Sequence, residues 1–154
     1  MGETEDDGVD AGVRTMLLLM PRLVGTAKRI KPPPELAGFD LAPRHLSLLA
    51  YLLFDGPLGV NELAKRLEVA PATVSLMVGD LGRQGIVERR ADPADRRRAI
   101  VAVTAEHLPA INEWLGRSAG AWRTALEPLS PAERRMFIDT LLTYERALTE
   151  ARDG

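Results

Sequence analysis

The sequence predicts a mainly α-helical (α+β) protein, and three observations lead to that fold class. Apolar residues recur at intervals of three and four, as on one face of a helix, over residues 13–30, 43–55, 62–67, 71–83, 104–127 and 130–148. Two short runs, 86–90 and 99–103, instead have the composition of strands. Proline and glycine separate these segments. The predicted order is three or four helices, a β-hairpin and two long helices.

The chain begins with an acidic stretch. Residues 1–10 contain five acidic and no basic side chains, so we expect a disordered tail there and a single domain over residues 11–154. Pro21 lies within the first helical stripe and should bend that helix. Three consecutive prolines, 32–34, then enforce an extended connection.

The helix from Pro43 to Asp55 starts with proline in its first turn, where a missing N–H costs nothing. Apolar residues occur on both of its faces, at Leu46, Leu49, Ala50, Leu53 and Phe54. A helix that is apolar on both faces is typically buried. We therefore place it in the middle of the domain.

The next two helices have the pattern of a helix-turn-helix. Asn61 is predicted to cap the helix over 62–67, and Pro71 opens the helix that ends near Arg83. The side chains predicted to face inward are Leu63, Ala64, Leu67, Val74, Met77, Val78 and Leu81. The second helix of such a pair can enter a DNA major groove, which is about 12 Å wide. An ordinary helical hairpin would have a similar pattern.

The hairpin that follows distinguishes these alternatives. Its two predicted strands are joined by a polar, proline-containing loop, and residues 83–98 hold six arginines against three acidic side chains. The net charge of the whole chain is −2, but local charge decides phosphate binding within a Debye length of about 8 Å. A helix-turn-helix followed by an arginine-bearing hairpin predicts a winged helix that binds DNA.

Composition excludes several classes of function. The chain has no cysteine, which rules out disulfides, thiolate metal sites and cysteine nucleophiles. Every apolar run, including 16–20, is far shorter than the roughly 20 residues of a membrane span, and the acidic N-terminus is unlike a secretory signal. We expect a cytoplasmic protein.

Without a glycine-rich phosphate loop, a Ser/His/Asp set or a metal-ligand cluster, we expect no enzyme activity, no cofactor and no metal.

Several motifs together resemble one known family. They read Leu-Ala-Pro at 41–43, Glu-Leu-Ala-Lys-Arg-Leu at 62–67, Ala-Thr-Val-Ser at 72–75, Gly-Ile-Val-Glu-Arg at 85–89 and Asp-Pro-Ala-Asp-Arg-Arg at 92–97, with Leu81 and the pair Val103-Thr104. Over residues 13–148 the sequence resembles the MarR-type winged helix-turn-helix transcriptional regulators of bacteria. The resemblance implies a winged-helix core over about 41–104 and dimerisation helices over about 13–30 and 104–148. It also implies a homodimeric repressor of a pseudo-palindromic operator, released by a small-molecule effector.

The apolar content of the outer helices agrees with a homodimer, because it exceeds what one small domain needs for its own core. The residues predicted to lie in the dimer interface are Leu17, Val24, Trp122, Phe137, Leu141, Tyr144 and Leu148. Two recognition helices would then face one side of a duplex, with half-sites about 10 bp apart.

The DNA-binding residues follow from the winged helix. On the recognition helix they are Pro71, Ala72, Thr73, Ser75, Leu76, Gly79 and Arg83. On the wing they are Arg89, Arg96, Arg97 and Arg98, braced by Asp92 and by Asp95, which we expect to pair with a nearby arginine. For Arg83 and Arg89, pairing with Asp80 or Asp92 is an alternative to phosphate contact.

The chain departs from the family at the recognition helix, which has no Lys or Arg from residue 67 to 82. Specificity could then come from contact between Leu76 and a thymine methyl group. Glu68 replaces a glycine common in the turn, and His107 another after Val103-Thr104. An alternative function is a winged-helix protein-interaction module with weak or no DNA binding.

A small aromatic or amphipathic effector would lie between the DNA-binding lobe and the dimer helices. The residues predicted to line this effector pocket are Met16, Met20, His45, Leu49 and Trp114. Side chains of these types at helical spacing are more often core than pocket, so a core role is the stronger alternative.

Overall fold

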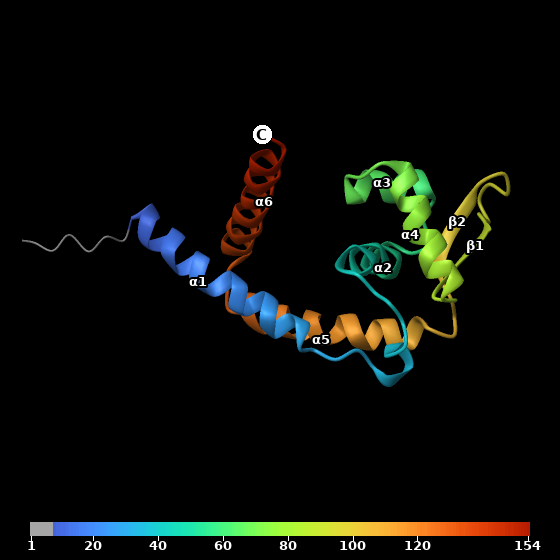
Figure 1. The fold of residues 1–154 in the computed structure, drawn as a ribbon, viewed down its shortest axis with the longest axis horizontal. Helices are drawn as coiled ribbons and strands as arrows, with labels where there is room; N and C mark the ends of the chain where they lie inside the picture. The colour runs from blue at the N-terminus through green and yellow to red at the C-terminus, as the bar shows by residue number, and fades with distance from the viewer. Residues whose placement is uncertain (1–7) are drawn as a thin grey trace, which may run out of the picture. The chain divides into compact units, whose positions relative to one another are not determined.

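The computed structural model describes residues 8–154 (Figure 1). Its elements are α1 (Val9–Lys28), the 3₁₀ turn η1 (Pro34–Leu36), α2 (Pro43–Asp55), α3 (Val60–Leu67), α4 (Pro71–Arg83), β1 (Val87–Ala91), β2 (Ala99–Val103), α5 (Leu108–Leu126) and α6 (Pro131–Asp153). The predicted fold class, mainly α with one small antiparallel hairpin, is confirmed. Within the described residues, no helix is long and apolar enough to cross a membrane.

The chain divides into two compact units, one extending to Trp114 and the other comprising Leu115–Gly154. In the first unit α2 packs against α3 and β2, α3 packs against α4, and α4 packs against β1. The apolar side chains of this unit that are at most 1% exposed form the centre of its core, namely Leu36, Leu48, Leu49, Leu63, Val74, Leu81, Ile86, Val101 and Ile111. This core fixes α4 and the hairpin against one another.

The helix-turn-helix formed by α3 and α4 has the predicted inner face. Val74, Met77, Val78 and Leu81 of α4 are all buried, as are Leu63 and Ala64 of α3, while Leu67 is half-buried. In the turn between the helices, Glu68 adopts a left-handed conformation with φ 55°. That conformation costs a non-glycine residue about 1–2 kcal/mol, a cost that glycine would not have.

The start of α3 differs from the prediction. The helix begins at Val60 with Gly59 before it, so Asn61 lies in the first turn and is not the cap. Immediately upstream, Leu58 pairs with Val101 of β2 through two backbone hydrogen bonds of 3.1 and 2.8 Å. The N-cap residue is Gly59, which has no side chain, so the helix starts without a side-chain cap.

The predicted hairpin is confirmed, with β1 antiparallel to β2, Val87 opposite Val103 and Ala91 opposite Ala99. Thr104 ends it: its N–H donates to the carbonyl of Ile86 at 2.9 Å, and its Oγ1 donates to the carbonyl of Gly85 at 2.9 Å. Since Thr104 is held in this way, α5 begins at Leu108, four residues after the predicted start.

Two other helices differ in detail. Helix α1 runs from Val9 to Lys28 and contains Pro21 within its length, where we predicted residues 13–30. On α2 the buried residues are His45, Leu48, Leu49 and Leu52. Phe54 is 78% exposed, so its predicted burial was wrong. The buried set follows the helical spacing i, i+3, i+4, i+7, which leaves Phe54 on the opposite face.

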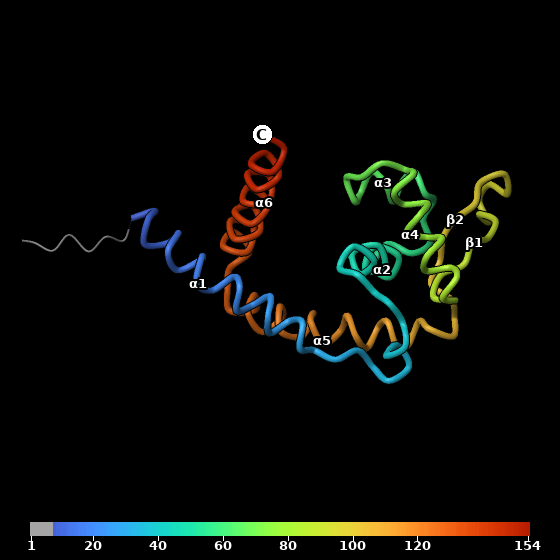
Figure 2. The backbone as a smooth tube through the Cα atoms, viewed as in Figure 1, coloured from blue at the N-terminus to red at the C-terminus, as the bar shows by residue number. Residues whose placement is uncertain are grey.

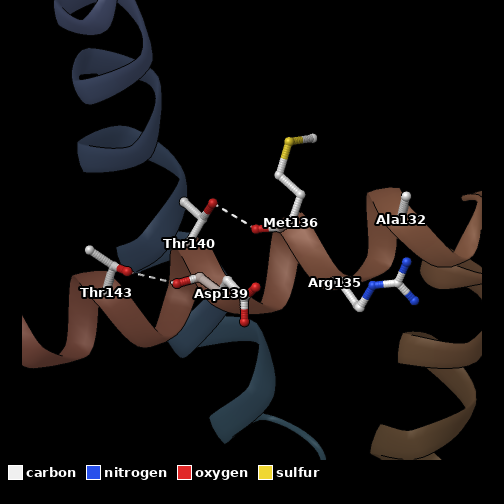
Figure 3. A pocket seen from close by; sticks show the side chains of 6 residues that line it. All are labelled: Ala132, Arg135, Met136, Asp139, Thr140 and Thr143. Atoms are coloured by element: carbon white, nitrogen blue, oxygen red, sulfur yellow. Dashed lines mark hydrogen bonds between the residues drawn. The ribbon is translucent and has the colours of Figure 1, made fainter.

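The second unit contains the C-terminal part of α5 and the whole of α6. The predicted capping box is confirmed: Ser130 Oγ accepts the N–H of Glu133 at 3.2 Å, and Glu133 Oε2 accepts the N–H of Ser130 at 2.7 Å. No side chain of α6 is buried. Figure 3 shows six residues of this one helix, among them Met136 and Thr143, lining a shallow open pocket. Helix α6 therefore leaves much of its surface uncovered within the chain.

Candidate nucleic-acid interface

Helix α4 turns an uncharged face outward. Pro71, Ala72, Ser75 and Leu76 are exposed, and the large apolar side chain of Leu76 is 72% exposed. Thr73 and Gly79 are half-buried. We call Ala72, Ser75, Leu76 and Gly79 the α4 outer face, since the spacing i, i+3, i+4, i+7 places them on one side of the helix. This face presents one hydroxyl and otherwise apolar atoms.

Arg83 ends α4 and forms an ion pair with Asp80, three residues earlier on the same helix. The arginine side chain extends back along the helix, where a β-carbon at Gly79 would lie 3.4 Å from its Nη1. Of the two roles predicted for Arg83, the structure has the pairing with Asp80. The only basic side chain of α4 therefore carries a carboxylate partner.

The inner side of α4 is attached to the segment around α2. Gln84 accepts the N–H of Asp40 at 2.9 Å and donates to the Asp40 carbonyl at 3.3 Å. His45 is buried, its Nδ1 accepts the N–H of Ala42 at 3.0 Å, and its Nε2 lies 4.0 Å from Asp80 Oδ2. Burial lowers the pKa of His45, and Arg44 lowers it further, against the opposing effect of Asp80 and Asp40.

The loop between the strands, residues 92–98, is held by its own backbone and by two aspartates; we call it the wing loop. Asp92 N–H donates to the Arg98 carbonyl at 2.9 Å, and Arg98 N–H donates to the Asp95 carbonyl at 3.0 Å. The carboxylate of Asp92 accepts the N–H of Ala94, and that of Asp95 accepts the N–H of Arg97. Asp95 thus binds the backbone of an arginine, whereas we predicted a pairing with an arginine side chain.

The arginines of the hairpin differ in their partners. Arg90 lies 3.9 Å from Glu88. In the described part of the chain, Arg89, Arg96, Arg97 and Arg98 form no ion pair with a carboxylate, and all four are exposed. The Arg98 guanidinium lies near the start of α3, where a β-carbon at Gly59 would be 3.9 Å from its Nη2. Figure 2 shows the tip of the hairpin projecting away from α2, α3 and α4.

The residues predicted for dimerisation retain exposed apolar surface. Leu17, Val24, Trp122, Phe137, Tyr144 and Leu148 are between 36 and 67% exposed, and Leu141 is half-buried. Trp122 and Phe137 contact each other in the second unit, with ring centroids 6.0 Å apart. These side chains do not form a closed core within the chain.

The residues predicted to line an effector pocket have different environments. Leu49 and His45 belong to the core of the first unit, and Leu49 has no exposed surface, so it cannot line a solvent-filled cavity. Met16 is exposed, while Met20 and Trp114 are half-buried. His45 and Leu49 therefore have the core role that was the alternative to lining an effector pocket.

Sequence reasoning missed the attachment of α4 through Gln84 and Asp40. These residues are 44 positions apart, and their contact joins a side-chain amide to a backbone. Such a contact has no periodicity or motif in a single sequence. The hydrogen bonds that the Asp92 and Asp95 carboxylates accept from the N–H groups of Ala94 and Arg97 could have been expected, since aspartate commonly accepts an N–H two residues ahead in turns.

Comparisons with known proteins agree with this geometry. Residues 39–98 match the model of the MarR family. The chain is 30% identical over 138 residues to the HTH-type transcriptional repressor YetL of Bacillus subtilis, covering 86% of this chain and 80% of YetL.

Solved structures share the fold. A probable transcriptional regulator from Pseudomonas aeruginosa is 27% identical, with a TM-score of 0.55 over 90% of this chain and 98% of that one. The PcaV transcriptional regulator from Streptomyces coelicolor, in complex with its natural ligand, is 22% identical, with a TM-score of 0.56 over 96% of this chain and 99% of PcaV. Together with the helix-turn-helix and its arginine-bearing hairpin, these similarities show that the chain belongs to the MarR family of winged-helix, DNA-binding transcriptional regulators.

Proposed function

We propose that this regulator is a homodimeric repressor that binds a pseudo-palindromic operator. Two neighbouring features carry the proposal. The α4 outer face is exposed, and the arginines of the wing loop have no carboxylate partner in the described chain. A duplex offers a groove for the helix and phosphates for the guanidinium groups. The enzyme alternative finds no support in relatives, which are transcriptional regulators.

The residues have separate roles in this proposal. Helix α4 lies in the major groove, where the hydroxyls of Thr73 and Ser75 donate to phosphates or base edges. Arg96 and Arg97 enter the adjacent minor groove or bind its phosphates, where a narrow groove concentrates negative potential. Arg89 and Arg98 bind phosphates beside the loop, and Asp92 and Asp95 hold the loop in shape.

The decisive experiment is selection of bound fragments from a genomic DNA library, followed by titration of the selected site at increasing salt. We expect one recurrent, two-fold symmetric site. Affinity should fall steeply with salt, because each phosphate contact contributes a slope of about −0.9 in log–log form. Failure to select any fragment, or an affinity insensitive to salt, would contradict the proposal and favour a protein-interaction module.

The dimer is proposed from the outer helices. Helix α6 has no buried side chain although it carries Phe137, Tyr144 and Leu148, and α1 exposes Leu17 and Val24. A second copy would remove this apolar surface from water, at a gain of about 25 cal/mol per Å². Such a surface is typical of an interface between copies related by a two-fold axis.

Removal of α6 tests the dimer. A chain ending before Ser130 should lose dimerisation, which light scattering measures against the 16.8 kDa chain mass. Since a truncated chain could also misfold, Leu148→Asp should give the same loss in the full chain. Thr149→Asp, at the next exposed position, is the matched control and should remain dimeric. A monodisperse dimer of residues 1–129 would refute the interface.

A small-molecule effector is part of the proposal. PcaV, which has the same fold, was solved with its natural ligand. Met16, Met20 and Trp114 keep solvent-accessible surface in the first unit and provide the apolar contacts that an aromatic or amphipathic molecule needs. Release of the selected DNA by small aromatic amphiphiles in a gel-shift assay tests this step.

A further inference from the structure

The α4 outer face lacks the groups that usually distinguish base pairs in the major groove. Arginine or lysine reads guanine, and asparagine or glutamine reads adenine. Helix α4 contains neither lysine, asparagine nor glutamine, and its only arginine is Arg83. Direct readout by α4 must therefore use other groups or depend on Arg83.

Arg83 is poorly placed for that task. It is the last residue of α4, about 18 Å along the axis from Pro71, whereas the N-terminal residues of a recognition helix contact base edges. Its guanidinium is also paired with Asp80. The groups left for readout are hydroxyls and apolar side chains in the first half of the helix, those of Pro71, Ala72, Thr73, Ser75 and Leu76.

Leu76 has no role in the core. The core contacts of α4 come from Val74, Met77, Val78 and Leu81, and Leu76 is 72% exposed on the other side. It lies in the N-terminal half of the helix, beside Ser75. Thymine presents a C5-methyl group next to the O4 acceptor in the major groove. A leucine methyl beside a serine hydroxyl matches that pair of groups.

We propose that Leu76 is a specificity-determining residue that contacts the C5-methyl group of a thymine, so that the operator has an A·T pair beneath the centre of each recognition helix. This inference rests on the proposed binding of α4 in the major groove. Apart from Arg83, α4 has no side chain of the kind that reads guanine, and phosphate contacts of the wing arginines add affinity without reading bases.

Replacement of thymine by deoxyuridine tests the inference, because it removes only the methyl group. In the selected operator, each symmetric pair of thymines is replaced in turn, and binding is titrated at fixed salt. At one pair, wild-type affinity should fall about fourfold per half-site and about 15-fold for both, the effect of one buried methyl group. Leu76→Ala should bind the thymine operator more weakly and show no further loss at that pair.

Phe54→Ala provides the matched control. Phe54 is a large apolar side chain of similar exposure on α2, so its removal should leave the full sensitivity to deoxyuridine. If wild-type protein binds the selected site but no replacement changes affinity more than twofold, the methyl contact is refuted and the proposed function stands. If the sensitivity persists in Leu76→Ala, another residue reads the methyl group. If no DNA is selected, the proposed function fails and this inference fails with it.

Discussion

Helix α4 and the wing loop are neighbours with opposite properties. The helix has four buried side chains on its inner side, Gln84 at its end is bonded to Asp40, and buried His45 lies 4.0 Å from Asp80, yet the outer face of the helix is uncharged. The wing loop has no buried side chain, and its shape depends on hydrogen bonds within residues 92–98, yet it bears exposed arginines. In the proposed interface, α4 is therefore the part anchored in the core, and the wing loop is the part that carries positive charge.

The difference indicates a division of work on DNA. Phosphate contacts position a protein and supply affinity that depends on salt, whereas contacts with base edges supply specificity. A charged, locally held loop suits the first task, and a helix that is anchored in the core and presents an uncharged face suits the second. Variants in the two regions should therefore differ in the kind of change they cause as well as in its size.

The largest effect should come from the wing. Arg96→Ala combined with Arg97→Ala should weaken operator binding by about 10- to 1,000-fold and flatten the salt dependence, because up to four phosphate contacts are lost per dimer. A gel-shift titration at several salt concentrations measures both changes. The dimer should stay folded by circular dichroism and light scattering. Unchanged affinity would show that the wing loop takes no part in the interface.

A smaller effect should come from Asp80→Asn. This change frees Arg83 from its carboxylate partner and removes a negative charge near the duplex, so affinity should rise about threefold to tenfold with a steeper salt dependence. The double variant Asp80→Asn, Arg83→Ala separates the two causes. Should the double variant keep the whole gain, Arg83 makes no phosphate contact even when free.

The smallest expected effect is a pH dependence of the folding stability, caused by His45 beside α4. Because the folded pKa of His45 lies below its ordinary value of about 6.5, the unfolded chain binds a proton more readily. Neutral His45 makes its full contribution to the free energy of unfolding above about pH 6.5. This contribution is lost as the pH falls from there through the folded pKa, and the free energy of unfolding changes by at most about 1.4 kcal/mol per pH unit.

The variant His45→Gln tests this linkage. Glutamine keeps an acceptor for the Ala42 N–H but does not titrate, so urea unfolding between pH 7.5 and 5 should show a shallower loss of stability than in wild type. If stability fell equally with pH in the wild type and in the variant, His45 would have the same pKa in the folded and the unfolded chain. The wing loop contains no histidine, so its contribution to stability should not depend on pH over the same range.

Most of the fold could be predicted because it depends on patterns that are local in sequence. The inner face of α4, the hairpin and the Ser130 capping box follow from periodicity and from short-range hydrogen-bonding motifs. The errors arose where contacts distant in sequence decided the outcome. The bridge between Leu58 and Val101 moved the start of α3 away from Asn61, and the bonds of Thr104 delayed α5.

The candidate site shows the same limit. Exposure of Leu76 and of the wing arginines follows from position in the pattern. Whether Arg83 binds Asp80 or a phosphate could not be decided from spacing, because a carboxylate three residues away on a helix and a ligand phosphate compete for one guanidinium. Burial of Leu49 likewise depends on which elements pack over α2.

The bonds that Asp92 and Asp95 make to backbone N–H groups have an evolutionary consequence. They use two side chains to set the path of the loop and leave the arginine side chains out of that task. Mutation can therefore add, remove or exchange cationic groups at positions 96 and 97 without redesigning the turn. A lineage could retune how tightly its repressor occupies the genome in small steps, while the scaffold that presents those groups stays constant.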